Sequence, residues 1–167
     1  QSLYIGDSRE SNVTRLKTIN IKTGAESVIA EDPRVDLGNV MAHPTKYHVQ
    51  AVSFNYDRDR WQVIDKDIEA DIAAIEQIAD AQVSIVARDR ADKTWLIAVD
   101  ADIAPTKYYT YSRDTKKADF LFSVRPDLEK YTFSTMKFVE IKTPDGLTLP
   151  CYLTLPSGVD PKNLPMV

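Results

Sequence analysis

The sequence predicts an all-β protein made of antiparallel sheets, with one inserted helix. Three observations support this prediction: short strand-like segments dominate the chain, a strand unit recurs about every 45 residues, and one segment has helical periodicity. The 43% of hydrophobic and 28% of charged residues are typical of a folded domain rather than a disordered chain. With 167 residues, the chain is long enough to bury a sizeable core.

The expected strands are short, rich in Val, Ile, Tyr, Phe, Thr and Trp, and bounded by Gly, Asp, Asn and Pro. Two polar segments between strands, residues 23–24 and 113–116, are typical of hairpin turns. The expected strands span residues 3–6, 14–21, 26–30, 37–42, 49–56, 61–64, 82–87, 94–101, 107–112 and 118–124.

Similar strands return at a regular spacing. The segments LYIGD (3–7), AVSFN (51–55) and LIAVD (96–100) start 48 and 45 residues apart, and the strands that follow them start 45 and 47 residues apart. A four-stranded propeller blade takes roughly 40–50 residues. The spacing therefore favours antiparallel β-propeller blades, although a β-sandwich with irregular loops produces similar spacing and stays open at this point.

One segment, residues 65–80, has a helical pattern instead. Its isoleucines stand at positions 68, 72, 75 and 78, which is the spacing of one helix face. Its acidic residues lie mostly in the N-terminal half, where the helix dipole favours negative charge. We predict an amphipathic helix of about four turns over residues 66–79, with the isoleucines on a sheet and the acidic face in solvent.

The composition changes after residue 124. A polar linker over 126–136 precedes two strands, 137–143 and 147–155, which flank a strong hairpin signal, Asp145-Gly146. The second strand has one fully apolar face, formed by Leu147, Leu149, Cys151, Leu153 and Leu155. These features divide the chain into a part over 1–125, a linker over 126–136 and a part over 137–167, whose last residues, 164–167, resemble the start of an apolar strand.

Charge and cysteine usage exclude several classes of partner. The net charge of −4 and the pI near 5.2 argue against a nucleic-acid or anionic-membrane partner, because both need a basic face. A single cysteine, Cys151, excludes an internal disulfide and a cysteine-rich zinc site, and on its apolar face we expect it to be buried. The longest apolar run, residues 95–99, is far too short for a membrane span.

The compartment is not decided by one cysteine. A bacterial periplasmic or secreted location is the first expectation, and the cytoplasm is equally allowed. The first residues, Gln1-Ser2-Leu3, resemble folded protein rather than a signal peptide.

The sequence contains few patterns that are typical of a catalytic, phosphate-binding or metal-binding site. No Gly-x-Ser-x-Gly nucleophile elbow occurs, the glycines never cluster into a phosphate loop, and His43 and His48 lack the spacing of a metal site, so we expect strand-end histidines. Paired carboxylates act in glycosidases only where two face one cleft, and at turns they favour local hydrogen bonding. The pairs are Asp57 and Asp59, Asp65 and Asp67, and Asp100 and Asp102. We predict no catalytic, cofactor-binding or metal-ligating residue, and no cofactor.

A resemblance to a known family adds to these predictions. Residues 138–156, FVEIKTPDGLTLPCYLTLP, resemble the hairpin that opens the α/β-hydrolase domain of the prolyl oligopeptidase family, in its acylaminoacyl-peptidase and dipeptidyl-aminopeptidase-like branch. The segments DRDR (57–60), DAD (100–102), YYTY (108–111) and LFSVRP (121–126) resemble, in this order, the closing blades of that family's propeller.

The resemblance implies a serine peptidase whose propeller restricts access to a hydrolase domain. This chain would then be a non-catalytic fragment: the last propeller blades over 1–125, with the helix, and the first hairpin and strand start of the hydrolase domain over 137–167. Its implied partners are peptide substrates and the enzyme's own hydrolase domain, and exposed strand edges allow a homo-oligomer. A free-standing β-propeller-like binding scaffold is the alternative, and an acid-pair glycosidase is a third.

Overall fold

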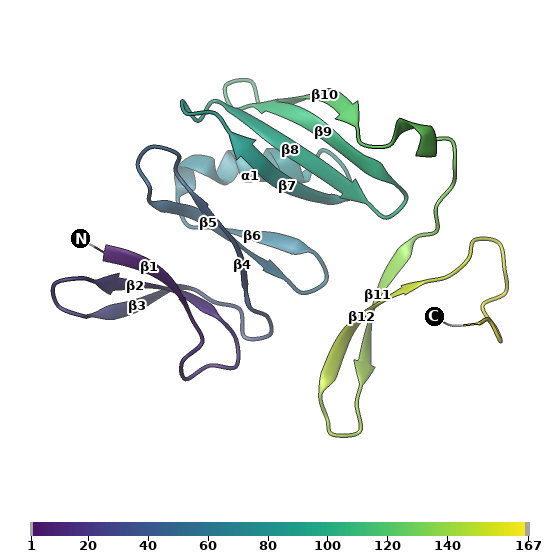
Figure 1. Ribbon diagram of the computed structural model, residues 1–167, viewed down its shortest axis with the longest axis horizontal. Coiled ribbons are helices and arrows are strands. Elements are labelled where there is room, and N and C mark those ends of the chain that lie inside the picture. The colour runs from purple at the N-terminus through teal and green to yellow at the C-terminus, as the bar shows by residue number, and fades with distance from the viewer. Residues whose placement is uncertain (1, 166–167) are drawn as a thin grey trace.

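The computed structural model describes residues 2–165 and places their strands in four antiparallel sheets (Figure 1). The all-β antiparallel fold predicted from the sequence is therefore confirmed. The strands are β1 (Ser2–Asp7), β2 (Arg15–Asn20), β3 (Glu26–Ala30), β4 (Leu37–Ala42), β5 (Val49–Asn55), β6 (Asp59–Val63), β7 (Gln82–Arg88), β8 (Thr94–Ala101), β9 (Ala104–Ser112), β10 (Lys117–Ser123), β11 (Met136–Lys142) and β12 (Thr148–Thr154).

Within each sheet, strands that follow one another along the chain are neighbours. The first sheet has the order β1-β2-β3, the second β4-β5-β6, the third β10-β9-β8-β7, and the fourth is the hairpin β11-β12. This meander topology is that of propeller blades. The expectation of uniformly four-stranded sheets is wrong for the first and second sheets. In the second, the chain leaves β6 and enters the helical segment instead of forming a fourth strand.

The second and third segments of the sequence repeat occupy equivalent positions in their sheets, whereas the first, residues 3–7, lies in β1, the first described strand of its sheet. Two of the three compared segments lie in β5 and β8, and each of these is the second strand of its sheet. The strands that follow them in the repeat are β6 and β9, which are the third strands. The spacing of about 45 residues therefore marks one blade-like unit rather than irregular loops of a sandwich.

The helical segment is shorter than expected. A single 3₁₀ turn, η1 (Lys66–Ile68), leads into α1 (Glu69–Glu76), so the predicted start is correct and the predicted end is about three residues too late. Tighter three-residue bonds, from Gln77 N–H to Ala74 C=O at 3.4 Å and from Ile78 N–H to Ile75 C=O at 3.2 Å, close the helix. The isoleucine stripe is buried as expected at positions 68, 72 and 75.

Two apolar clusters hold the first three sheets together. The larger one lies between α1 and the second and third sheets, and it includes Ile72, Ile75, Trp95 and Ile97. The smaller one lies between the first and second sheets, around Leu16, Val52 and Phe54. Strand β5 contributes to both, Ala51 to the larger cluster and Val52 to the smaller, because it is buried on both faces.

The turns of the sheets lie on two opposite edges. Figure 1 shows the β5–β6 and β8–β9 turns pointing toward the hairpin β11-β12, whereas the β4–β5 and β7–β8 turns lie at the other end of the strands. Gly146, at φ +86°, forms the hairpin turn predicted from Asp145-Gly146, and its N–H donates to the Thr143 carbonyl at 3.0 Å. The strand start expected at residues 164–167 includes positions outside the described residues.

Candidate functional site at the junction of the second and third sheets

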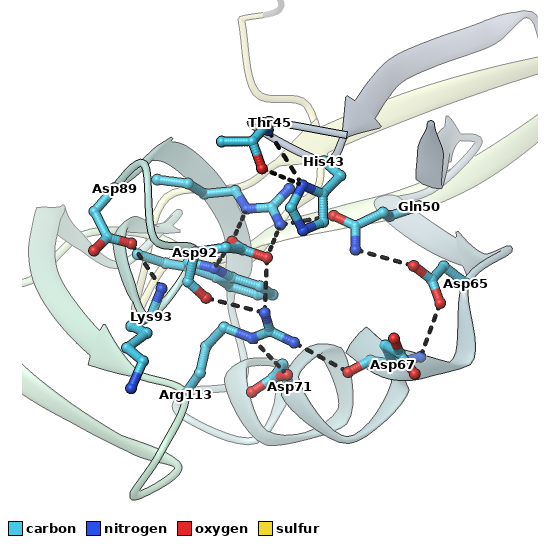
Figure 2. A network of polar contacts seen from close by, with 12 residues as sticks. His43, Thr45, Gln50, Asp65, Asp67, Asp71, Asp89, Asp92, Lys93 and Arg113 are labelled. Atoms are coloured by element: carbon cyan, nitrogen blue, oxygen red, sulfur yellow. Dashed lines mark hydrogen bonds and ion pairs between the residues drawn. The ribbon is translucent and has the colours of Figure 1, made fainter. Parts of the chain in front are cut away.

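A network of buried charges lies at the edge of this junction away from the hairpin (Figure 2). At its centre is Asp92, in the β7–β8 turn, with only 3% of the residue exposed. Arg88 Nε donates to the carboxylate Oδ1 at 2.7 Å, and Arg88 Nη2 forms an ion pair with Oδ2 at 2.5 Å. The Trp95 indole N–H donates to Oδ1 at 2.9 Å and Arg113 Nη1 to Oδ2 at 2.7 Å. Three charge-assisted hydrogen bonds and one further ion-pair contact therefore compensate the burial of this carboxylate.

Helix α1 enters the network through Asp71, which is fully buried. Its carboxylate accepts from Tyr111 Oη at 2.8 Å, from Arg113 Nε at 3.0 Å and from the Lys116 ammonium. Burial by itself would raise the pKa of Asp71, but the bonds from Lys116, Tyr111 and Arg113 hold this pKa below its ordinary value. Burial and the bond to Asp71 raise the pKa of the Tyr111 hydroxyl well above its ordinary value.

The second sheet is connected to this network by Gln50 of β5, which is 1% exposed. The Gln50 side-chain oxygen accepts from Arg88 Nη2 at 2.7 Å, and its amide donates to Asp65 Oδ2 at 3.1 Å. His48 Nε2 is hydrogen-bonded to the same Asp65 oxygen at 2.8 Å. The bonds from His48, from the Asp67 backbone N–H and from Gln50 lower the pKa of Asp65 to about 2.

The charged side chains at the centre of this network, Arg88, Asp92 and Arg113, bind one another or neighbouring polar groups in the part of the chain that the structure describes. The guanidinium carbons of Arg88 and Arg113 lie 5.0 and 5.3 Å from the Trp95 ring centroid, which adds cation–π contacts to the ion pairs. Arg113 also donates to the Asp92 carbonyl at 3.0 Å and to the Asp67 carbonyl at 3.0 Å. Because the donors and acceptors are paired with one another, the network's chemistry is to fix helix α1 and two sheets in one arrangement.

The opposite edge of this junction, which faces the hairpin, contains a cavity. A cavity of about 580 Å³ lies between the β5–β6 turn, the β8–β9 turn and the hairpin. An ion pair between Arg58 Nη1 and Asp80 Oδ1, 2.7 Å long, joins the β5–β6 turn to the segment before β7. The cavity is lined by Asp57, Arg58, Asp80, Ala81, Gln82, Asp100, Ala101, Asp102, Met136, Phe138 and Tyr152.

The paired carboxylates of the sequence are engaged in local bonds. Asp57 pairs with Arg60 at 2.6 Å, Asp65 accepts from the Asp67 N–H at 3.1 Å, and Asp100 is bonded to the Thr106 hydroxyl. The remaining two bonds reach further along the chain: Asp59 accepts from Asn39 at 3.3 Å, and Asp102 from the Met136 N–H at 2.5 Å. Turn formation and contacts between segments therefore account for the positions of five of these six carboxylates; of Asp67, only the backbone takes part in the bonds given.

The two histidines lie at strand ends, as expected, with ring centroids 5.4 Å apart. The Nδ1 atom of His43 accepts from the backbone N–H groups of Thr45 and Lys46 at 3.2 and 3.1 Å, and burial lowers the pKa of His43. Among residues 2–165, no group of three or more His, Cys, Asp or Glu side chains lies close enough to hold a metal ion. Within the same residues, no helix has the length and apolar character needed to cross a membrane.

Cys151 corrects one expectation, because it is half-buried rather than buried. Its neighbours on the same hairpin face, Leu149 and Leu153, are 47% and 41% exposed, so the described chain covers this face only in part. The residues of the buried network around Asp92 were not predicted from the sequence. One signal was available: Gln50 stands in the predicted strand 49–56, between apolar residues, where an uncharged polar side chain must find a buried partner.

Comparisons with known proteins bear on this geometry. No protein-family model matches the chain. It is 41% identical over 163 residues to Dipeptidyl aminopeptidase BIII of Pseudoxanthomonas mexicana, covering 98% of this chain and 24% of that relative. It is 30% identical over 124 residues to Dipeptidyl peptidase family member 6 of Caenorhabditis elegans, covering 74% of this chain and 17% of that relative. The chain thus spans about a quarter or less of the length of these relatives.

A solved structure, from a study of two prolyl endopeptidases, matches the fold with a TM-score of 0.63 and 12% identity, covering 95% of this chain and 24% of that one. The likeness covers nearly the whole chain, so it supports the arrangement of blade-like sheets followed by a hairpin. The sequence similarity to two dipeptidyl peptidases and the likeness of fold to a prolyl endopeptidase structure thus support the resemblance of this chain to the prolyl oligopeptidase family.

Proposed function

We propose that this chain is the access-restricting section of a serine peptidase that hydrolyses peptides. Residues 1–125 form blades of its propeller, 126–136 a linker, and 137–167 the start of its hydrolase domain. The observation that carries the proposal is the 41% identity over 98% of the chain to a dipeptidyl aminopeptidase. The parent enzyme would take peptides as substrates, and the hydrolase domain would be the partner of the blades.

In this proposal the residues of this chain form part of a barrier that excludes large substrates, and they do not form a catalytic centre. Peptide hydrolysis by a serine peptidase needs an activated serine, its histidine and an oxyanion hole. The chain has no nucleophile elbow, and both histidines have structural partners: His43 accepts from its own turn and His48 is bonded to Asp65. The buried network around Asp92 makes the junction of two blades more rigid. This rigidity maintains the structure of the barrier to large substrates.

Labelling with a fluorophosphonate probe tests the catalytic part of the proposal. The 167-residue chain should remain unlabelled and should not hydrolyse chromogenic dipeptidyl or acylaminoacyl substrates. The full-length protein that contains this section should be labelled at one serine downstream of it and should hydrolyse one of these substrates. A full-length protein that folds but neither reacts nor hydrolyses would support the alternative, a binding scaffold, and stoichiometric labelling of the 167-residue chain would contradict the proposal.

Access restriction is tested separately, by substrate size. In the full-length protein, Arg113→Ala removes the bonds to Asp71 and to the Asp67 carbonyl, which join the helical segment to the third sheet. A less rigid barrier should raise kcat/KM for peptides of about 20 residues relative to kcat/KM for a short chromogenic substrate. Lys93→Ala is the control, because Lys93 is exposed and makes only a surface pair with Asp114. If the ratio of the two kcat/KM values is unchanged in a folded Arg113→Ala variant, the proposal that this section restricts access is wrong.

A further inference from the structure

The hairpin β11-β12 has two different faces. In its antiparallel register Phe138 is opposite Tyr152, whereas Val139 is opposite Cys151 and Ile141 is opposite Leu149. Because directly opposite residues share a face, Phe138 and Tyr152 lie on one side and the leucine-rich set lies on the other. The second face, with Leu147, Leu149, Cys151, Leu153 and Leu155, is the apolar face predicted from the sequence and is called the leucine-rich face below.

The face with Phe138 and Tyr152 is the one that contacts the blades. The Tyr152 hydroxyl donates to the Asp57 carbonyl in the β5–β6 turn at 2.7 Å. From the same turn, the Tyr56 hydroxyl donates to Glu140 Oε1 of β11 at 2.6 Å. The ring of Phe138 lies between the two tyrosines, with centroids 5.4 Å from Tyr56 and 5.8 Å from Tyr152, in the tilted and edge-on geometries that aromatic rings prefer.

The second and third sheets both take part in this contact. The guanidinium carbon of Arg34 lies 4.3 Å from the Tyr56 ring centroid, so Tyr56 contacts both Arg34 and Phe138. In the third sheet, Asp102 of the β8–β9 turn accepts from the Met136 N–H, at the first residue of β11, at 2.5 Å. The hairpin is thus attached at its start to one sheet and along its length to another.

We infer that Tyr56, Tyr152 and Asp102 are positioning residues that fix the hairpin on the blades and so determine where its leucine-rich face points. These residues, with Phe138 and Glu140, are called the clasp below. The inference deepens the proposed function, since it rests on the hydrolase domain being the element that follows the hairpin and covers Leu149 and Leu153. An isolated two-stranded hairpin is marginally stable in water, so its contacts with other parts of the protein, the clasp among them, contribute to its order.

Amide hydrogen exchange of the full-length protein tests the clasp directly. Tyr56→Phe and Tyr152→Phe each remove one hydroxyl and leave the ring, and Asp102→Ala removes the acceptor of the Met136 N–H. Each variant should speed exchange across β11 and β12 by about fivefold, because a single net hydrogen bond contributes on the order of 1 kcal/mol. Exchange in β8 and β9 should not change. Tyr131→Phe is the matched control, since Tyr131 is 58% exposed and its ring only neighbours Lys130.

Two further measurements separate positioning from general stability. Asp102→Asn keeps an oxygen acceptor for the Met136 N–H, so it should restore slow exchange where Asp102→Ala does not. The doubly substituted protein Tyr56→Phe with Tyr152→Phe should change KM for peptide substrates by about threefold or more while kcat stays within about twofold, because the reacting groups lie elsewhere in the parent enzyme. A parallel fall of kcat in every variant, or equal KM in all of them, would contradict positioning.

The outcomes also separate this inference from the proposed function. A full-length protein without peptidase activity removes the proposed function, and the exchange rates of β11 and β12 still decide whether the clasp exists. A protein that hydrolyses peptides, but whose variants exchange and bind substrate like the unaltered chain, keeps the proposed function and overturns the clasp.

Discussion

Asp92 and Arg88 form a bidentate ion pair at the β7–β8 turn of the third sheet, with Nε–Oδ1 and Nη2–Oδ2 distances of 2.7 and 2.5 Å. The Arg88 and Asp92 side chains are 8% and 3% exposed, so water screens the pair little. The Asp92 backbone adopts a left-handed conformation, at φ 56°, which Asp and Asn tolerate better than most residues. Replacing the carboxylate by an amide therefore removes the charge without adding backbone strain.

We expect Asp92→Asn to lower the free energy of unfolding by about 3 kcal/mol, because it removes the carboxylate that Arg88 pairs with and one of the two carboxylates that Arg113 pairs with. Urea unfolding followed by the fluorescence of Trp95, which donates to Asp92, measures this loss. Asp114→Asn is the control, since Asp114 is 69% exposed and pairs only with Lys93 at the surface. That change should cost less than about 0.5 kcal/mol, and equal losses in the two variants would refute a special role for the buried pair.

Acid stability should depend on Asp65. The pKa of Asp65 is about 2 in the folded chain, against an ordinary value of 3.8, because His48, the Asp67 N–H and Gln50 stabilise the carboxylate. A lowered folded-state pKa contributes stability above about pH 4, and this contribution is lost as the pH falls toward 2. Asp65→Asn should therefore be less stable than the unaltered chain at pH 7, and the difference should shrink between pH 4 and 2. A difference that stays constant over that range would disprove this linkage.

Gly38 is expected to tolerate no side chain. A Cβ atom at this position would lie 2.9 Å from Ser53 Oγ and 3.0 Å from the Ser53 carbonyl oxygen. Ser53 is fully buried and its hydroxyl accepts from the Asn39 N–H at 2.9 Å, so it cannot move aside without losing that bond. Gly38→Ala should lower the free energy of unfolding by about 1–3 kcal/mol in calorimetry, whereas Val40→Ala, at a 44% exposed position of the same strand, should cost much less. A fully stable Gly38→Ala chain would show that the second sheet relaxes easily.

Local patterns made the strands predictable, and distant partners made the site unpredictable. The bounds of β3, β4 and β8 agree with the sequence prediction because turn residues flank each of them. By contrast, Arg113 reaches Asp71 and Asp92 across 42 and 21 residues, and nothing in the local sequence indicates such pairs. Periodicity also could not show that the helical segment replaces a fourth strand, since the repeat compares only two strands of each unit.

The hairpin illustrates the same limit. The alternation of Leu149, Cys151 and Leu153 correctly predicted an apolar face, but whether a face is covered depends on chain beyond the pattern. The clasp on the opposite face joins Tyr56 to Glu140 across 84 residues and Tyr152 to Asp57 across 95. Such contacts follow from how the sheets are arranged, so only a three-dimensional structure shows them.

Self-association of the 167-residue chain through the leucine-rich hairpin face is our last prediction. Leu147, Leu149 and Leu153 are 61%, 47% and 41% exposed, and contiguous apolar surface of this kind favours association. We expect light scattering to show dimers or larger species at about 100 µM, and Leu149→Gln to shift the population toward monomer because it removes an apolar side chain from the centre of the face. Val159→Gln is the control: Val159 is 52% exposed but lies outside the hairpin, so the oligomer should persist. If the unaltered chain is monomeric at that concentration, or if both variants dissociate it equally, the leucine-rich face is not the surface through which copies associate.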